Sequence, residues 1–243
     1  MNFTALGIRT LALFTVGALL MALGTVRRPP EVRRARVLKF VVYFAIVHGV
    51  ILVCAVGDHA PLALVMVIVA LSTWEAARAW RRIAAPRPWA FGVGAALLAL
   101  AATAASDAID AHLVAWIFVV TAACDGFAQV VGQWLGRRAL APAVSPGKTV
   151  EGLLGGVVGA LLVALWIRSL TPFSVPGALV VGALVACAAL AGDLTGSWIK
   201  RRAGIKDFSR LLPGQGGVLD RFNSFLAALG TVGAWIAFGP PFP

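Results

Sequence analysis

Long apolar runs are the feature that most constrains how this chain can fold. Residues 38–56, 112–131 and 175–198 are three examples, each nearly free of charged side chains. A helix of about 20 apolar residues is long enough to cross the hydrocarbon core of a bilayer. Because lipid offers the backbone no hydrogen-bond partners, such runs are expected to be helical. The sequence therefore predicts an all-α, polytopic integral membrane protein.

The composition of the 243-residue chain agrees with that class. Hydrophobic residues make up 60% of the chain and charged residues only 13%, whereas soluble domains carry about 25% charged residues. The formal net charge is +11, which in a soluble protein would indicate a nucleic acid partner. In a membrane protein, topology and contact with anionic membrane lipid explain such a charge. We therefore expect membrane lipid as a partner and no nucleic acid.

Eight apolar segments, each long enough to span the membrane or nearly so, account for the predicted crossings. They cover residues 5–26, 38–56, 60–74, 89–105, 112–131, 152–170, 175–198 and 222–238. Nineteen of the 21 Lys and Arg residues lie in the connections after the first, third, fifth and seventh segments or, for Lys39, at the edge of one. Since cytoplasmic connections carry the excess of Lys and Arg, we expect a multi-pass protein of the inner (cytoplasmic) membrane with both termini outside.

Two of the connections are long and polar, namely residues 137–151 and 199–221. The alternation of charge places both on the cytoplasmic side, so chemistry on a cytosolic substrate is expected there. On this basis residues 1–110 form N-terminal transmembrane helices, and residues 111–243 form a C-terminal catalytic core with two motif loops.

Carboxylates are scarce, and two of the ten acidic residues, Asp125 and Asp193, lie within or at the edge of apolar segments. A charged Asp at the centre of a membrane helix costs about 2.5–3.5 kcal/mol on insertion scales. Such a group has to face a polar cavity, bind a cation or make a structural hydrogen bond to a neighbouring helix. Asp193 ends one apolar segment and Asp220 begins the next, so a hairpin of the two segments would bring both carboxylates to one level.

The two loops are rich in groups that bind phosphate. Residues 199–221 hold Lys200, Arg201, Arg202, Lys206, Arg210 and Arg221. A glycine-rich turn at residues 213–217 would let the backbone approach a phosphate closely. Ser145, Lys148 and Thr149 in the other loop are further donors, although the spacing is not that of a Walker A loop. Two carboxylates beside such loops suggest Mg²⁺ holding phosphates; the alternative is a basic loop that contacts lipid headgroups.

The second loop resembles the conserved motif of phosphatidate cytidylyltransferases, also named CDP-diacylglycerol synthases. That motif runs S-x-[apolar]-K-R, four residues, K-D, then P-x-H-G-G-[apolar]-x-D-R-[apolar]-D. The residues in register are Ser197, Ile199, Lys200, Arg201, Lys206, Asp207, Ser209, Leu212, Pro213, Gly216, Gly217, Val218, Asp220, Arg221 and Phe222. Asp125, Gly132, Gly136 and residues 140–152 are similar to an upstream part of the family pattern. The resemblance covers roughly residues 115–235.

Three positions depart from the family pattern. Gln215 stands where the family has His, Asn223 where it usually has Asp, and Gly196 where many members have Glu. The first change removes an imidazole that can titrate or contact phosphate, and the other two remove carboxylates. Asp193 and Asp220, which the family uses for metal, are both retained.

The resemblance implies that the protein is an enzyme that converts CTP and phosphatidic acid to CDP-diacylglycerol and pyrophosphate. The lipid phosphate would attack the α-phosphorus of CTP in line, so no protein nucleophile is required. The resemblance assigns Asp193 and Asp220 to Mg²⁺, with Asp125 as an additional ligand or a cavity-lining group. It leaves open whether a second, monovalent cation binds, and it allows a homodimer.

Roles for the remaining motif residues follow from the same resemblance. The catalytic residues would be Asp193, Asp220, Lys200 and Arg221. The substrate-binding residues would be Ser145, Lys148, Thr149, Ser197, Arg201, Lys206, Gln215, Gly216 and Gly217. Two alternatives stay open: a CTP-dependent lipid kinase of the polyprenol or phytol type, and a lipid-binding homologue without catalytic activity.

Overall fold

The computed structural model describes residues 3–26, 29–57, 59–83 and 110–239. Its helices are α1 (Phe3–Thr25), α2 (Pro30–Val56), α3 (His59–Trp80), α5 (Ala111–Leu135), α6 (Val150–Trp166), α7 (Val175–Arg202) and α8 (Val218–Phe238), with a short 3-10 helix η1 (Arg168–Leu170). Two strands, β1 (Ala139–Ala141) and β2 (Ser145–Thr149), form an antiparallel hairpin between α5 and α6. The fourth predicted segment, residues 89–105, lies outside the described residues.

The helices confirm the prediction of an all-α, polytopic membrane protein. Five of them, α1, α2, α3, α5 and α7, are long and apolar enough to cross a membrane. Helix α6 is apolar but shorter, with 17 residues. Helix α8 differs from the others because most of its residues, including Asp220 and Asn223, are buried within the bundle.

Helix α7 extends further than the apolar pattern predicts. The predicted segment ends at residue 198, whereas the helix continues through Lys200, Arg201 and Arg202. Basic side chains in the last turn of a helix are stabilised by its dipole. The helix ends there because Gly204 adopts a left-handed conformation with φ +66°. Three basic residues predicted in a loop, Lys200, Arg201 and Arg202, are therefore held on a helix.

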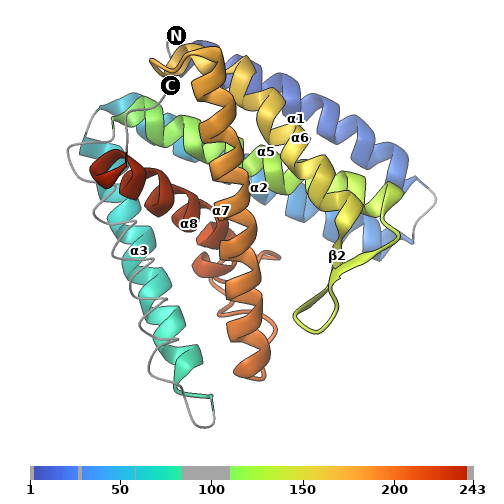
Figure 1. The fold of residues 1–243 in the computed structure, drawn as a ribbon. Coiled ribbons are helices and arrows are strands. Elements are labelled where there is room, and N and C mark those ends of the chain that lie inside the picture. The colour runs from blue at the N-terminus through green and yellow to red at the C-terminus, as the bar shows by residue number, and fades with distance from the viewer. Residues whose placement is uncertain (1–2, 27–28, 58, 84–109, 240–243) are drawn as a thin grey trace.

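Close helix packing depends on small residues at two interfaces. Helix α6 packs on α5 (Figure 1), and a side chain at Gly156 would lie 2.8 Å from the Cys124 carbonyl oxygen. Helix α7 packs on α8, where a side chain at Gly192 would lie 2.6 Å from the Asn223 carbonyl oxygen. Glycine at these positions lets the helix backbones approach closely, as small residues do in membrane bundles.

The two motif loops lie at one end of the bundle. The hairpin extends beyond the ends of α5 and α6 toward the C-terminal part of α7 (Figure 1). There Arg201 Nε donates a 3.2 Å hydrogen bond to the Val144 carbonyl oxygen. At the other end, the Arg9 guanidinium of α1 donates to the Trp166 carbonyl oxygen at the end of α6. The fold thus gathers the two basic connections in one place.

Candidate active site at the α7–α8 crossing

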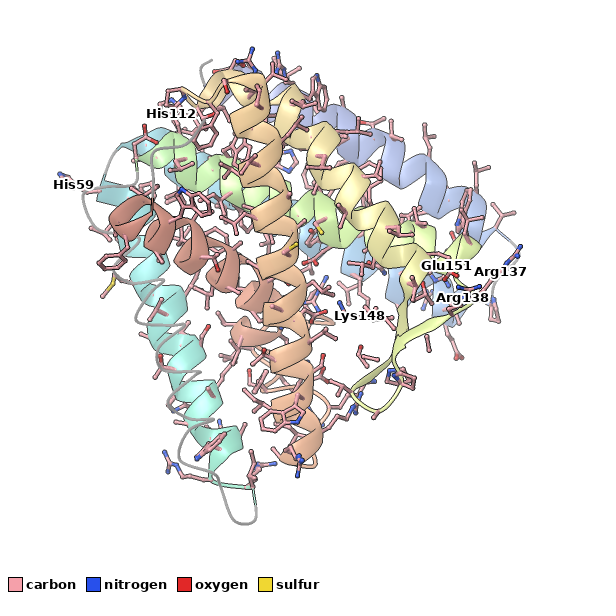
Figure 2. The ribbon with its side chains drawn as sticks, in the orientation of Figure 1. His59, His112, Arg137, Arg138, Lys148 and Glu151 are labelled. Atoms are coloured by element: carbon pink, nitrogen blue, oxygen red, sulfur yellow. The ribbon has the colours of Figure 1, made fainter. Side chains whose placement is uncertain are left out.

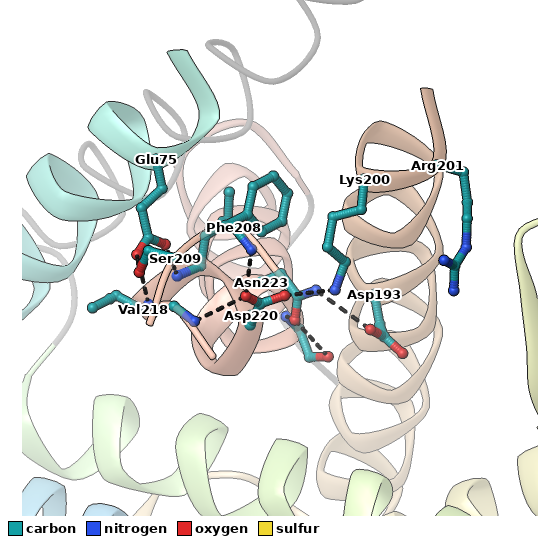
Figure 3. Close-up of polar contacts among 12 residues, drawn as sticks. Glu75, Asp193, Lys200, Arg201, Phe208, Ser209, Val218, Asp220 and Asn223 are labelled. Atoms are coloured by element: carbon teal, nitrogen blue, oxygen red, sulfur yellow. Dashed lines mark hydrogen bonds and ion pairs between the residues drawn. The ribbon is translucent and has the colours of Figure 1, made fainter. Parts of the chain in front are cut away.

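Asp193 and Asp220 lie on adjacent helices and border the same crossing. Asn223 Nδ2 on α8 donates to Asp193 Oδ1 on α7 across 3.4 Å. Asp220 lies one turn before Asn223 on α8. Figure 3 shows the two carboxylates and Lys200 facing the space between the helices. Gly196, on the turn of α7 after Asp193, makes room for the Asn223 amide, because a side chain at Gly196 would lie 2.7 Å from Asn223 Nδ2.

The Asp220 carboxylate is buried and is bonded on both oxygens. Its Oδ1 accepts a 2.5 Å hydrogen bond from Lys200 Nζ. Its Oδ2 accepts from the backbone N–H groups of Phe208 and Gly217, at 2.8 and 2.9 Å. The side chain is only 2% exposed, so these donors replace the water that a buried charge loses. Asp220 thereby closes the loop that precedes α8 and holds the Lys200 ammonium.

The Asp193 carboxylate has a more open environment. It forms an ion pair with Lys148 on β2, and the two side chains are 26% and 28% exposed. Lys148 reaches toward the bundle from the hairpin, whereas Arg137 and Arg138 lie at its outer side (Figure 2). The ion pair joins α7 to the hairpin through side chains alone, in contrast to the backbone bonds of Asp220.

Asp125 on α5 belongs to the same group of charges. Its carboxylate interacts electrostatically with Asp193, Lys148 and Arg221, and it accepts a hydrogen bond from the Ser224 side chain. Asp125 and Arg221 are both exposed at the surface of the described structure. The structure thus brings Asp125, Asp193 and Lys148 together from three separate elements.

Among the other predicted phosphate ligands, Thr149 has a structural contact. Thr149 caps α6 by accepting a 3.1 Å hydrogen bond from the Gly152 N–H group. A side chain at Gly136 would lie 2.7 Å from Thr149 Cγ2, which explains the glycine at that position. Ser145 and Ser197 are half-buried, and Lys206 is exposed on the loop before α8.

Glu151, which follows the hairpin and precedes the apolar segment 152–170, fixes the end of α5 to the start of α6. It accepts hydrogen bonds from the backbone N–H groups of Arg137 and Arg138, at 2.9 and 3.2 Å. These backbone hydrogen bonds, first that of Arg137, hold the pKa of the Glu151 carboxyl below its usual value. Glu151 therefore shapes the hairpin, which in turn positions Lys148.

The glycine-rich turn is held against the rest of the bundle. Gln215 is buried, and its Nε2 donates a 2.7 Å hydrogen bond to the Lys39 carbonyl oxygen on α2. Gly216 has φ +89°, and a side chain there would lie 2.8 Å from Asp220 Oδ2. Gly217 is in close contact with Glu75, since a side chain added at Gly217 would lie 2.5 Å from Glu75 Oε1. The turn residues predicted to bind substrate are thus packed between α2, α3 and α8.

Glu75 on α3 is an acidic residue of this region that the sequence analysis missed. It is fully buried, and it accepts hydrogen bonds from Ser209 Oγ at 2.5 Å, Val218 N at 3.1 Å and Leu219 N at 2.7 Å. The available signal was a lone Glu directly after the apolar segment 60–74. Its partners lie more than 130 residues away in the chain, so the sequence gives no pattern that joins them.

The chemistry of these side chains suits an oxygen-preferring divalent cation. Among residues 3–83 and 110–239, apart from the undescribed gaps at 27–28 and 58, no group of three or more His, Cys, Asp and Glu side chains could hold a metal. Mg²⁺ commonly binds one or two carboxylates and completes its shell with water and substrate phosphates. Asp193 fits this pattern because its partner is already a cation, the Lys148 ammonium. Asp220 can join only if the Lys200 ammonium leaves its Oδ1.

Comparison with known proteins agrees with the motif resemblance. The model of the cytidylyltransferase family matches residues 9–238. A phosphatidate cytidylyltransferase of Brucella abortus is 34% identical over 190 residues, which cover 75% of this chain and 67% of that protein. A phosphatidate cytidylyltransferase of Synechocystis is 47% identical over 107 residues, which cover 43% of this chain and 36% of that protein.

A further relative is the protein YnbB of Escherichia coli, which is described as uncharacterized. It is 43% identical over 117 residues, which cover 48% of this chain and 39% of that protein. A phosphatidate cytidylyltransferase of Haemophilus influenzae is matched over 43% of its length, so the chain spans less than half of these two relatives. Because the family model extends over most of the chain, the resemblance found in the motifs is confirmed, and this chain belongs to the cytidylyltransferase family.

Proposed function

We propose that this protein is a phosphatidate cytidylyltransferase, which makes CDP-diacylglycerol and pyrophosphate from CTP and phosphatidic acid. The observation that carries the proposal is the α7–α8 crossing, where two carboxylates and two lysines from β2, α7 and α8 meet: Asp193 with Lys148, and Asp220 with Lys200. The relatives named phosphatidate cytidylyltransferase, among them that of Brucella abortus, support the same reaction.

In the proposed reaction, an oxygen of the lipid phosphate attacks the α-phosphorus of CTP. A new P–O bond forms at the α-phosphorus. The bond between the α-phosphorus and the oxygen that joins it to the β-phosphorus breaks, and pyrophosphate leaves. The attacking oxygen is already anionic, so the protein does not need to supply a nucleophile. Its task is to position two negatively charged substrates and to offset their charge.

Lys148 and Lys200 are suited to that task because each is paired with a carboxylate. A metal cation could replace the ammonium group at that carboxylate and leave the lysine free to bind phosphate. In the proposed complex the two ammonium groups move from Asp193 and Asp220 to phosphate oxygens. Arg201, Lys206 and Arg221 add positive charge at the same end of the bundle. Ser145, Thr149, Ser197, Gln215, Gly216 and Gly217 would line or shape the nucleotide site.

Mg²⁺ is the proposed cofactor, held by Asp193 and Asp220 with Asp125 nearby. When bound, it would neutralise charge on the phosphate that is transferred. Titration of activity with potassium at fixed Mg²⁺ would test whether a second, monovalent cation takes part.

The topology proposed from the charge pattern places both motif loops on the cytoplasmic side of the inner membrane. CTP would then reach the site from the cytosol, and phosphatidic acid would enter sideways between helices with its acyl chains in the bilayer. A homodimer is compatible with the family resemblance, and mass measurement in detergent would test it.

The test is product analysis with purified protein, Mg²⁺ and phosphatidic acid. CTP labelled at the α-phosphate should give a labelled lipid, and CTP labelled at the γ-phosphate should not. Lipid labelled from the γ-phosphate would instead identify a lipid kinase. No lipid product from either label, in protein that binds CTP, would identify a homologue without catalytic activity.

A further inference from the structure

Glu75 is an acidic residue on α3 that no motif of the active site includes. It and Asp220 are the two acidic residues that are buried within the described ranges. A buried carboxylate needs partners that replace its hydration. For Glu75 these partners are not side chains of α3 or its neighbours in sequence, but groups next to the active site.

The contacts of Glu75 and Asp220 enclose one loop from two sides. Glu75 binds the Ser209 hydroxyl near the start of the loop and the backbone N–H groups of Val218 and Leu219 at its end. Asp220 binds the N–H groups of Phe208 and Gly217. Figure 3 shows Glu75 on one side of the start of α8 and Asp220 beside it, with Lys200 beyond.

The first turn of α8 suits a carboxylate from another helix. The first N–H groups of a helix have no partner within the helix, and the positive end of the helix dipole favours a negative charge. Val218 and Leu219 supply two such N–H groups to Glu75, one to each carboxylate oxygen. Gly217 leaves the space that this approach requires.

We propose that Glu75 is a positioning residue for the cytidylyl transfer, which it serves through α8 rather than by touching substrate. By anchoring Val218 and Leu219 it sets the place of the next residue, Asp220, whose carboxylate holds the Lys200 ammonium in this structure and is proposed to hold Mg²⁺ in the substrate complex. The inference rests on the proposed function. It gives α3 a part in catalysis that the sequence analysis did not assign to residues 1–110.

The central experiment compares wild type with Glu75→Gln at a temperature well below the melting temperature of both proteins. Gln keeps the shape but offers one acceptor oxygen, so at least one N–H group of α8 faces an amide N–H group. We expect kcat to fall about 10- to 100-fold, as when a catalytic group is displaced by about 1 Å. A side chain that only adds stability would leave kcat of the folded variant unchanged.

A second measurement does not depend on activity. Lys206 and Arg210 are exposed on the loop that Glu75 anchors, and trypsin cleaves after both residue types. We expect faster cleavage of this loop in Glu75→Gln than in wild type. Ser72→Ala is the matched control, because Ser72 lies one turn earlier on α3, is buried and has no hydrogen-bond partner in the described structure. It should change neither kcat nor the cleavage rate.

The outcomes separate this inference from the proposed function. Wild-type kcat and wild-type cleavage in folded Glu75→Gln would overturn the inference and leave the proposed function standing. If wild type forms no labelled lipid, the proposed function fails, and unchanged cleavage would then overturn the anchoring by Glu75 as well. If Glu75→Gln does not fold, Ser209→Ala replaces it, because it removes one Glu75 bond and should still lower kcat and speed cleavage.

Discussion

The two sides of the α7–α8 crossing hold a carboxylate in opposite ways. On the α8 side, Asp220 is 2% exposed and is bonded to two backbone N–H groups as well as to Lys200. On the α7 side, Asp193 is 26% exposed and is paired with the Lys148 ammonium. Asp220 is part of the folded loop, whereas Asp193 can exchange its cation without disturbing backbone contacts. Two acidic residues of the same motif can therefore have different roles, one mainly structural and one able to exchange its cation.

The largest effect is expected for Asp220→Asn, which should damage both folding and activity. An amide has one acceptor oxygen, so at least one of the three donors loses its partner. Each buried donor left unpaired costs about 1–3 kcal/mol, and the Lys200 ammonium loses its charge partner. We expect a lower melting temperature and a loss of lipid product. An unchanged melting temperature would contradict the structural role that sets Asp220 apart.

Asp193→Asn should separate the two sides most clearly. Partly exposed ion pairs contribute about 0–1 kcal/mol to stability, so the melting temperature should hardly change. Activity should fall by about 100-fold or more, because charge neutralisation at the transferred phosphate is lost. Measuring both quantities for Asn at 193 and at 220 completes the comparison. Equal destabilisation by the two variants would remove the distinction drawn here.

Lys148→Met tests whether the partner of Asp193 serves the substrate. Met keeps much of the side-chain length but removes the ammonium group, and the pair is more than a quarter exposed. We expect KM for CTP to rise about 10-fold, the loss of roughly one charge-assisted hydrogen bond, with little change in stability. Arg137→Met is a suitable control, because Arg137 contacts Glu151 through its backbone N–H group. A larger effect for Arg137→Met would place the nucleotide elsewhere on the hairpin.

Gly216→Ala should affect the Asp220 side alone. The residue has φ +89°, and an added side chain would lie 2.8 Å from Asp220 Oδ2. Strain of this kind costs about 1–3 kcal/mol. We expect a lower melting temperature and a modest fall in kcat. Gly147→Ala, in strand β2 where a side chain would meet nothing within 4 Å, should leave both quantities at wild-type values.

The fold could be predicted from the sequence because apolar runs and scarce charges specify helices in a membrane. Helix α3 is longer than the apolar pattern predicts. Its predicted segment ends at residue 74, but the helix runs to Trp80 and buries Glu75. A Glu after an apolar run suggests a polar end, yet this one is buried and accepts hydrogen bonds from backbone N–H groups near the far end of the chain.

The sequence offers Asp193 and Asp220 as candidate site residues, but it does not show that the structure holds the two carboxylates by different contacts. Asp193 and Asp220 could be found because carboxylates are costly at the edges of apolar segments. That Asp220 binds backbone N–H groups follows only from the path of residues 203–217, and that path depends on contacts with α2 and α3. No local pattern in the chain records such contacts.

Gln215→His is the smallest expected effect and tests what the departure from the family pattern means. In the sequence, Gln in place of His suggests a lost acid, base or phosphate ligand. In the structure, the Gln215 amide ties the glycine-rich turn to the Lys39 carbonyl oxygen of α2. An imidazole N–H group can donate the same bond, so we expect kcat within about threefold of wild type, the effect of roughly one neutral hydrogen bond.

The control for this change is Gln215→Leu, which fills the space but cannot donate to Lys39. It should lower the melting temperature more than His does, because the buried carbonyl oxygen loses its donor. A large gain in kcat with His would show instead that position 215 faces the substrates. The glycine-rich turn would then contact substrate, as Asp193 is proposed to do. The contrast between a structural Asp220 and a substrate-facing Asp193 would no longer hold for the residues around Asp220.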